Sequence, residues 1–396
     1  MDVTGIRSTK FWVRATLVPL VVAACAGPSG SAHSDSVASC GSRPSNPAPA
    51  HRTDKAATGG EDWVLLPASP LAARGNHSAV WTGRELIIWG GAAKGGFAQF
   101  SDGAAFNPQF PQWRRLPDSP LTPRDLHTAV WTGDEMIIWG GMERDSGTEF
   151  GDGAAYNPVT NCWRVLSDAP IEGRAEHAAV WTGDKMSVWG GQSDDYLADG
   201  ASYEPATDSW SKLPSSPLSP RVGVQAVWTG REVLVWGGCS NAGAAPDGAA
   251  YDPVASSWRI LPPAPRSGCI DAVWTGQQMI VWGSAGSEVP GASFDPVTST
   301  WSPIPAPDLP DLGESSVTWA DSALVVWGGS MEPDAQYRAV GAVFQPELNR
   351  WHTLPPSPLS PRANHSATWT GTELVIWGGL TENLGQAADG AAISSL

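Results

Sequence analysis

The sequence predicts an all-β fold assembled from seven copies of one short unit, and the spacing of its tryptophans is the main evidence. Twenty-one of the 22 tryptophans in this 396-residue chain fall into seven triplets, and only Trp12 stands apart. Within a triplet the second gap is always 8 residues, and the first is 18 in six triplets and 16 in the fifth. Such a fixed pattern indicates a repeat fold. Glycine (44) and proline (35) are abundant and no long stretch has helical periodicity, which favours short strands joined by tight turns.

Each unit contains four predicted strands. In the first unit, an apolar run at 79–81 meets a Thr-Gly turn and a second apolar run at 86–89, which is the pattern of a hairpin. A third run follows a variable loop and lies at 102–108, and a fourth, at 113–117, contains the first tryptophan of the next triplet. Both runs of the hairpin are apolar on both faces. The sheet must therefore be covered on both sides.

Four-stranded units of this length, with Gly-Gly after the second strand and a tryptophan on the fourth, resemble kelch repeats. The resemblance covers residues 61–396 and all seven units, and it implies a seven-bladed kelch-type β-propeller with four antiparallel strands in each blade. The chain enters at 63–67 with a fourth-strand sequence and ends at 389–393 with a third-strand sequence. We therefore expect the N-terminal strand to complete the last blade, rather than an open solenoid with two free edges.

Residues 1–25 have the pattern of an export signal. Basic residues precede a short apolar core at 15–26, which is too short to span a bilayer comfortably. The run Val-Ala-Ala-Cys at 22–25 resembles the lipobox of bacterial lipoproteins, in which the cysteine is acylated, so we expect Cys25 to be lipidated. The alternative is ordinary cleavage nearby, with Cys25 discarded. Residues 26–60 are rich in Ser, Gly, Ala and Pro, a composition that predicts a flexible tether.

Charge and export set limits on the partners. The formal net charge of −16 disfavours nucleic acid, because an acidic surface repels phosphate. We expect a monomer that contacts a membrane only through its lipid anchor and whose ligand is a protein or a carbohydrate. An exported protein matures in an oxidising compartment. Because Cys239 and Cys269 fall at the same rim of adjacent blades, we expect a bridge between them, with two free thiols as the alternative. Cys162 on an outer strand and Cys40 on the tether are not obvious competitors, although the sequence leaves their pairing open.

An arginine recurs just before the first strand of six units. In a kelch-type propeller these side chains would lie near the channel mouth, where they could bind a carboxylate or another anion. Five units also carry an aspartate at the start of the third strand, which makes a structural Arg–Asp pair the favoured interpretation, since buried arginine is normally paired. The arginines are Arg74, Arg124, Arg174, Arg221, Arg266 and Arg362, and the aspartates are Asp102, Asp152, Asp199, Asp247 and Asp389.

A histidine lies four residues before the central tryptophan in four units, which become consecutive if the ring closes. An arc of imidazoles beside a channel could ligate a metal or act as acid and base. Histidine at this position of kelch units can also bond to a neighbouring backbone, so we assign no metal, cofactor or catalytic residue. The four are His77, His127, His177 and His365.

Some proteins of the kelch fold are enzymes, notably the galactose oxidase type and sialic acid epimerases. The oxidase type needs a copper site with tyrosines, but Tyr156, Tyr203 and Tyr251 share one repeated third-strand position and are expected in the core. No GxSxG, HExxH, P-loop or dinucleotide motif occurs.

Binding is expected in the variable loops between the second and third strands, because loops on a rigid scaffold carry function. The longest are 92–101, 142–151 and 330–340. Their aromatic side chains could form a recognition face or stack on a carbohydrate, or else could cap the ends of the blades. The candidates are Phe97, Phe100, Phe150 and Tyr337.

These observations predict an exported, lipid-anchored binding or interaction module at the bacterial cell membrane or cell surface. The alternative is a sugar-processing enzyme resembling the sialic acid epimerases, with the recurring arginines and histidines as a pocket at the loop face. Unpaired arginine and histidine side chains in a convergent pocket would favour the enzyme. Arginines that are all satisfied by aspartate or backbone would favour the scaffold.

The anchor can be tested at Cys25. Because the thiol is the atom that would carry the lipid, Cys25→Ala should release the protein from the membrane fraction or leave the precursor uncleaved. Fractionation and intact mass of the expressed protein measure both outcomes. A variant that partitions and matures like the unaltered chain would rule out lipidation at this cysteine.

Overall fold

The computed structural model describes residues 63–93, 98–265, 270–283, 290–309, 315–331, 336–382, 385–394 and 396. The chain divides into two compact units, 1–36 and 37–396, and every described residue belongs to the second. Secondary structure in the described ranges is all-β apart from short 3-10 turns such as Pro346–Leu348, which confirms the predicted class. No helix in this part of the chain is long and apolar enough to cross a membrane.

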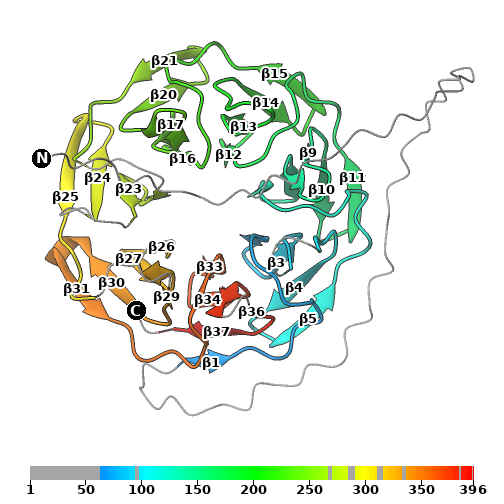
Figure 1. Ribbon diagram of the computed structural model, residues 1–396, viewed down its shortest axis with the longest axis vertical. Coiled ribbons are helices and arrows are strands. Elements are labelled where there is room, and N and C mark those ends of the chain that lie inside the picture. Colours follow the sequence, from blue (N-terminus) through cyan, green and yellow to red (C-terminus); the bar gives the residue numbers. More distant parts are fainter. Residues whose placement is uncertain are drawn as a thin grey trace, which may run out of the picture. The chain divides into compact units, whose positions relative to one another are not determined.

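Within the described ranges, seven antiparallel sheets of four strands follow one another around a common centre (Figure 1). Six sheets take their four strands in chain order. The first strands, nearest the centre, are β2 (Ser78–Trp81), β6 (Thr128–Trp131), β12 (Ala178–Trp181), β16 (Gln225–Trp228), β22 (Asp271–Trp274), β26 (Ser316–Ala320) and β33 (Ser366–Trp369). The second strands are β3 (Leu86–Trp89), β7 (Met136–Trp139), β13 (Met186–Trp189), β17 (Val233–Trp236), β23 (Met279–Trp282), β27 (Ala323–Trp327) and β34 (Leu374–Trp377).

The outer half of each sheet has the same regularity. The third strands are β4 (Gly103–Asn107), β10 (Gly153–Asn157), β14 (Gly200–Glu204), β20 (Gly248–Asp252), β24 (Gly291–Asp295), β30 (Gly341–Gln345) and β37 (Gly390–Ile393). The outermost strands are β5 (Gln112–Arg115), β11 (Cys162–Val165), β15 (Ser209–Lys212), β21 (Ser257–Ile260), β25 (Thr300–Ile304), β31 (Arg350–Thr353) and β1 (Val64–Leu65).

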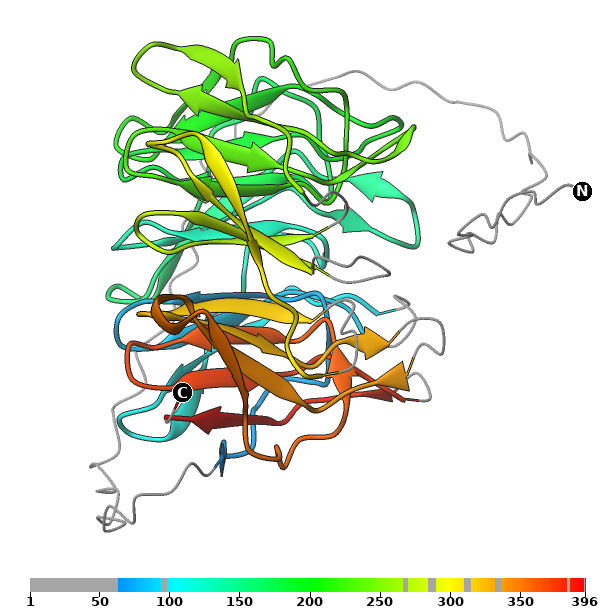
Figure 2. The ribbon, with the colours of Figure 1, turned by 90° about the vertical axis from the view of Figure 1, so that its left-hand side faces the viewer.

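Small strands extend the loops that follow the second strands. They are β8 (Met142–Glu143) with β9 (Thr148–Glu149), β18 (Cys239–Ser240) with β19 (Gly243–Ala244), β28 (Ser330–Met331) with β29 (Gln336–Tyr337), and β35 (Leu380–Thr381) with β36 (Gly385–Gln386). In the last unit, β32 (Arg362–Ala363), which precedes the first strand, pairs with β35. Figure 2 shows the teal β8–β9 hairpin projecting from one side of the ring, at the right of that view. We call this side the loop face.

The seventh sheet joins distant parts of the chain. Its order is β1-β37-β34-β33, and Val64 pairs with Ala392 while Leu65 pairs with Ala391. The earliest described strand is therefore the outer edge of a sheet whose other strands come from the last described residues.

The second strands explain why the sheets need neighbours on both sides. Every residue of β3, β7 and β34 is buried, so both faces of these strands are covered. One face of β3 packs against β7: Ile87 and Trp89 share a core cluster with Met136 and Ile138. Burying such side chains contributes roughly 1.5–3 kcal/mol each, which makes the contact between sheets the main source of stability.

The tryptophan triplets form these contacts. A second-strand tryptophan of one sheet meets a fourth-strand tryptophan of the next, with ring centroids 4.5–6.2 Å apart. The pairs are Trp89–Trp163, Trp139–Trp210, Trp189–Trp258, Trp236–Trp301, Trp282–Trp351, Trp327–Trp63 and Trp377–Trp113. Offset and tilted indole pairs of this kind add to the burial energy.

Each fourth-strand tryptophan also donates a hydrogen bond to the sheet before it. The indole Nε1 bonds to a backbone carbonyl at 2.7–3.0 Å, and six of the seven acceptors are proline carbonyls. Trp113 bonds to Pro67 O and Trp163 to Pro117 O, so the donor and acceptor differ by one unit. Trp63 bonds to Pro355 O, which is 292 residues later in the chain.

Two of the cysteines in the described ranges are oxidised. Cys162 and Cys239 are both disulfide-bonded. Cys269, the expected partner of Cys239, lies outside the described residues, and so do Cys25 and Cys40. The bridge between Cys239 and Cys269 stays a prediction.

Candidate functional site

Five of the six recurring arginines lie in the described ranges, and all five are buried. Their side chains are 0% exposed, and each forms an ion pair with an aspartate at 2.7–2.9 Å, while the aspartate side chains are 42–57% exposed. The pairs are Arg74–Asp102, Arg124–Asp152, Arg174–Asp199, Arg221–Asp247 and Arg362–Asp389. Arg266 lies outside the described residues.

Backbone carbonyls accept hydrogen bonds from Nε and Nη1 of these guanidinium groups, while Nη2 of Arg74 and Nη2 of Arg174 are buried without a hydrogen-bond partner in the described ranges. In the second unit, Arg124 Nη1 donates to Gly140 O at 3.1 Å and Nε donates to Thr122 O at 3.1 Å. The other four arginines make the equivalent bond to the first glycine of their own Gly-Gly pair, at 3.1–3.2 Å. The arginine therefore ties the entry of the first strand to the end of the second. Because the five described arginine side chains are 0% exposed, they do not present a ring of guanidinium groups to an anion.

Phe100 and Phe150 cover two of these arginines. The guanidinium carbon of Arg74 lies 3.9 Å from the centre of the Phe100 ring, and that of Arg124 lies 4.0 Å from the Phe150 ring. Both rings are partly buried, and both residues bond through their backbone to the scaffold, as in Phe150 N to Gly141 O at 2.8 Å. This contact gives the two rings a packing role. Tyr337 lies on β29, and Phe97 lies outside the described residues.

The four histidines link neighbouring sheets. His127 Nε2 lies 3.0 Å from Ser78 Oγ of the preceding sheet, and its ring stands edge-on to Trp89, with centroids 5.0 Å apart. The same pair of contacts recurs at three other junctions, where His77 meets Ser366 and Trp377, His177 meets Thr128 and Trp139, and His365 meets Ser316 and Trp327. We call each of these a histidine latch.

The latches explain the first glycine of the Gly-Gly pair. A Cβ atom on Gly140 would lie 2.6 Å from Cε1 of His177, and one on Gly90 would lie 2.7 Å from Cε1 of His127. Both glycines also have positive φ, 69° and 68°, where a side chain is strained. Glycine is therefore required at this point because the histidine of the next sheet fills the space.

Burial keeps the latch histidines neutral. Burial is the largest cause and the charge of the nearby arginine the next, and together they lower the pKa of His77, His127, His177 and His365 to about 3 in each case. The described ranges hold no group of three or more His, Cys, Asp or Glu side chains that could hold a metal ion. The histidines are arranged for packing between sheets and for one hydrogen bond each.

One set of residues beside the latches was not singled out from the sequence. Asn76, Leu126, Glu176 and Asn364 lie directly before the histidines and have positive φ, between 53° and 55°. Their backbones bond from one unit to the next, as in Glu176 N to Leu126 O at 3.1 Å. The signal in the sequence was their position, five residues before the central tryptophan in each unit. It was hard to recognise because the residue type at this position differs between units.

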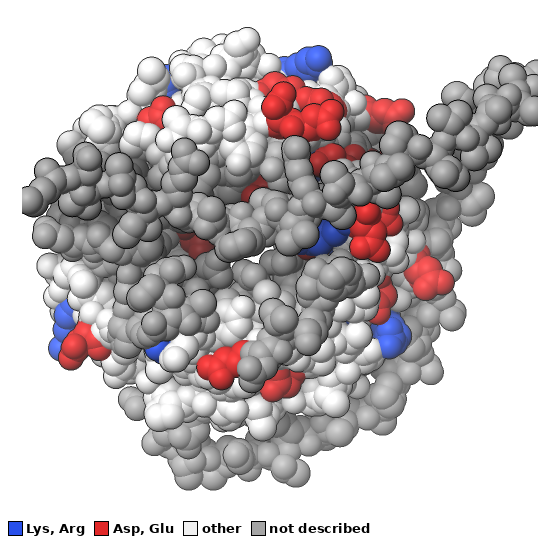
Figure 3. All heavy atoms as spheres, in the orientation of Figure 1, with Lys and Arg blue, Asp and Glu red and all other residues white. Residues whose placement is uncertain are grey.

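The loop face also has a buried ion pair within the second unit, which a glutamine of the first unit joins. Asp125 is 0% exposed, and its carboxylate accepts from Arg144 Nε at 2.7 Å and from Gln99 Nε2 at 2.7 Å. Gln99 belongs to the loop of the first unit, and Arg144 to the hairpin of the second. The network fixes the two loops to each other. Beyond it, acidic side chains such as Asp145 and Asp195 are exposed, and Figure 3 shows acidic groups spread over this face.

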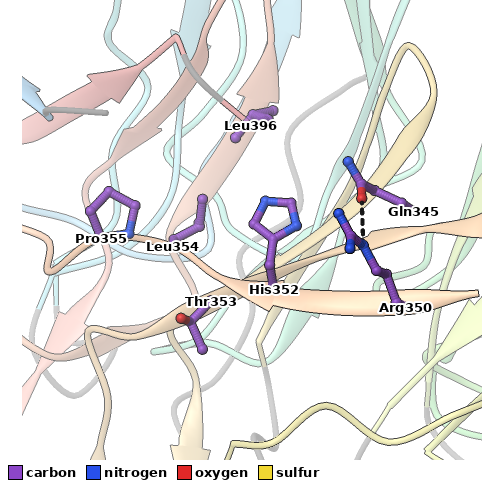
Figure 4. Close-up of a pocket in the computed structure, with 7 residues that line it drawn as sticks. All are labelled: Gln345, Arg350, His352, Thr353, Leu354, Pro355 and Leu396. Atoms are coloured by element: carbon purple, nitrogen blue, oxygen red, sulfur yellow. Dashed lines mark hydrogen bonds between the residues drawn. The ribbon is translucent and has the colours of Figure 1, made fainter. Parts of the chain in front are cut away.

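A shallow pocket lies on the perimeter of the sixth sheet, among Gln345, Arg350, His352 and Leu396 (Figure 4). Its volume is about 270 Å³. In three other sheets the residue equivalent to His352 is an arginine that pairs with a glutamate just before the second strand, such as Arg114 with Glu85 at 2.7 Å. The sixth sheet has His352 and Ala323 at those two positions, and the pair is lost.

A family model described as the KLHDC2/KLHL20/DRC7 Kelch-repeats domain matches residues 58–220 and, in a second placement, residues 126–316. No curated protein matches the chain.

The buried arginine can be tested at Arg124. Arg124→Ala should lower the free energy of unfolding by about 2–4 kcal/mol, because buried carbonyls lose their donor. The half-exposed Asp152 can be rehydrated, so the loss comes from the carbonyls and not from a stranded carboxylate. Urea unfolding measures the change, with the exposed Arg231→Ala as the control, expected within about 0.5 kcal/mol of the unaltered chain. An unchanged stability combined with lost ligand binding would assign Arg124 to a binding site instead.

The latch histidines predict an acid-sensitive stability. Their pKa is about 3 when folded and 6.5 in the reference state, so the unfolded chain binds more protons between these values. The contribution of the latches to the free energy of unfolding should be fully present above pH 6.5. Below pH 6.5 it should fall by about 1.4 kcal/mol per pH unit for each latch. The double variant Ser78→Ala with His127→Val copies the apolar junction of Ala178 and Val224. It should show a shallower fall between pH 6.5 and 5, and equal slopes would contradict the argument.

Proposed function

The chain belongs to the KLHDC2/KLHL20/DRC7 Kelch-repeats domain family, and from that premise we propose that it is a ligand-binding module rather than an enzyme. The observation that carries the proposal is that the recurring arginine and histidine side chains are engaged in contacts within the fold. Five arginines are held by aspartate and carbonyl groups, and four histidines are held between sheets. A sugar-processing pocket would need some of these groups accessible at the loop face, and all five arginine side chains are 0% exposed.

The binding surface of this proposal is the loop face. Its loops differ between units in length and composition, while the sheets beneath them repeat. Exposed carboxylates such as Asp145 and Asp195 favour a protein or carbohydrate ligand that offers basic groups or hydrogen-bond donors. The β8–β9 hairpin is held by the Asp125–Arg144 pair, so its carboxylates are presented by a fixed backbone.

The proposal includes a closed ring of seven blades, with the N-terminal strand as the last strand of the seventh. The pairing of β1 with β37 supports this closure. So do the contacts of Trp63, whose ring packs on Trp327 and whose Nε1 bonds to Pro355 O. These are the contacts that the equivalent tryptophans make at the other six junctions.

We also propose that the protein is exported, monomeric and anchored at the cell membrane or cell surface through a lipid on Cys25. The support is the sequence of residues 1–60 alone: a basic start, an apolar core, the run ending in Cys25, and a tether rich in small residues.

Closure can be tested by deletion of residues 61–70. The deletion removes β1 and the partly buried Trp63 and exposes the edge of β37, so it should cost about 3 kcal/mol or more in the free energy of unfolding. Thermal unfolding compares this variant with a deletion of ten tether residues, 41–50. A 61–70 variant that melts within a degree or two of the tether variant would refute closure by this strand.

The loop face can be tested with two pairs of substitutions. A glycan array and a cross-linking screen with surface proteins would identify a ligand of the full chain. Asp145→Ala with Asp195→Ala should then weaken binding by about tenfold or more, because charge complementarity is lost. Asp134→Ala with Glu347→Ala changes the net charge equally at turns on the other side and should leave binding unchanged. Equal effects would contradict the assignment, and turnover of a sugar ligand would favour the enzyme.

A further inference from the structure

The histidine latch is present at four junctions between sheets and absent at the other three. The residue that opens each first strand always stands opposite the tryptophan that closes the second strand, as Ser78 opposes Trp89 and Asp271 opposes Trp282. At this opening position the latched sheets have Ser78, Thr128, Ser316 and Ser366. The unlatched sheets have Ala178, Gln225 and Asp271.

At one unlatched junction, apolar residues replace both members of the latch. Between the third and fourth sheets, Ala178 meets Val224 in place of the serine and the histidine, and both side chains are buried in one apolar cluster. No polar group is left over. Loss of a latch therefore does not by itself create a polar site.

The next two junctions keep a polar group without a partner. Gln225 opens β16, and the histidine position of the following unit is Ile270, a buried apolar side chain. Asp271 opens β22, and the histidine position of the following unit is Ser315, whose side chain is much shorter than imidazole. In the described part of the chain, the side chains of Gln225 and Asp271 make no hydrogen bond or ion pair. Both side chains are partly exposed, so a ligand that enters from solvent can supply the partners that the neighbouring sheets do not.

Asp271 is the more informative of the two. It is partly buried, so a small group can still reach it, and burial raises the pKa of its carboxyl to about 6. The strands packed against β22 are β16 and β26, which open with Gln225 and Ser316, so no titratable side chain faces Asp271 from those positions. A serine at this position, as in three other sheets, would avoid the free-energy cost of desolvating a carboxylate.

We propose that Asp271 and Gln225 form a binding site for a primary ammonium group on the inner wall of the fourth and fifth sheets. The carboxylate supplies the counter-charge, and the amide oxygen of Gln225 accepts a second N–H. An ammonium group carries three donors and no acceptor, which matches a site of oxygen acceptors. A calcium ion needs six to eight oxygen ligands, more than one carboxylate and one amide can offer. The ligand is therefore an amine, such as the side chain of a lysine or a small organic ammonium ion.

The binding test uses butylammonium as the probe and the full chain as the protein. Saturation-transfer NMR should show saturable binding that weakens about tenfold or more in Asp271→Ser and in Asp271→Asn, because a charged hydrogen-bond partner is removed. The exposed Asp134→Asn changes the net charge equally and should bind as the unaltered chain does. Tetramethylammonium, which has the charge but no N–H donor, should depend on Asp271 less than butylammonium does, because it keeps the charge attraction but loses the hydrogen bonds.

Stability separates a binding residue from a structural one. If Asp271 is kept for a ligand, Asp271→Ser should raise the melting temperature of the free protein, because an unpaired carboxylate is replaced by the residue of the latched sheets. A lower melting temperature would assign Asp271 a structural role. The proposal is overturned by that result, by absence of saturable butylammonium binding, or by calcium ions alone binding in an Asp271-dependent manner. Failure here would leave the loop face as a binding surface untouched.

Discussion

A four-stranded sheet that is apolar on both faces cannot be stable alone, and this constraint governs the whole molecule. The second strands are buried throughout, so each sheet must be covered by the sheet before it and the sheet after it. The tryptophan pairs supply that cover at every junction, and the indole hydrogen bonds to the preceding unit fix its register. The contact between sheets is thus the repeating unit of stability, and the seventh sheet obtains its share through Trp63.

The other recurring residues serve the same contact. The arginine holds the first strand to the end of the second within its own unit, and the histidine fills the space above the glycine of the unit before it. These roles bury the guanidinium and imidazole groups that looked most capable of chemistry. What remains for binding are the positions where the repeat is broken: the loops, whose length varies, and the opening of β16 and β22, where a polar side chain has lost its partner.

The all-β class and the repeated four-stranded unit could be predicted from the sequence, because the repeat itself is the evidence for them. Tryptophans at fixed spacing report contacts between units, and Gly-Gly reports a point where no side chain fits. The role of the arginines was left between two interpretations for a physical reason. Sequence shows that Arg124 and Asp152 recur together, but not that Gly140 O and Thr122 O take the remaining donors. Phe100 and Phe150 were uncertain for the same reason, since an aromatic ring in a loop does not reveal the guanidinium beneath it.

Asp271 was missed although its signal was available. Alignment of the seven units places it against serine, threonine, alanine and glutamine, and a charged residue in that column is an exception. This exception can be interpreted only once the histidine latch is known, because the partner that Asp271 lacks is the histidine of the next unit, where Ser315 stands. The disulfide at Cys162 was likewise not expected, since an outer-strand cysteine gives no sign of its partner.

The dependence of each sheet on its neighbour is tested most directly by a double-mutant cycle across one junction. Trp139→Leu and Trp210→Leu would be made singly and together, and the free energy of unfolding measured in urea, with Trp139 and the distant Trp301 as the control pair. The account predicts a coupling energy of about 0.5–1.5 kcal/mol for Trp139 with Trp210 and none for the control pair. Additive effects for Trp139 and Trp210, within about 0.3 kcal/mol, would contradict it.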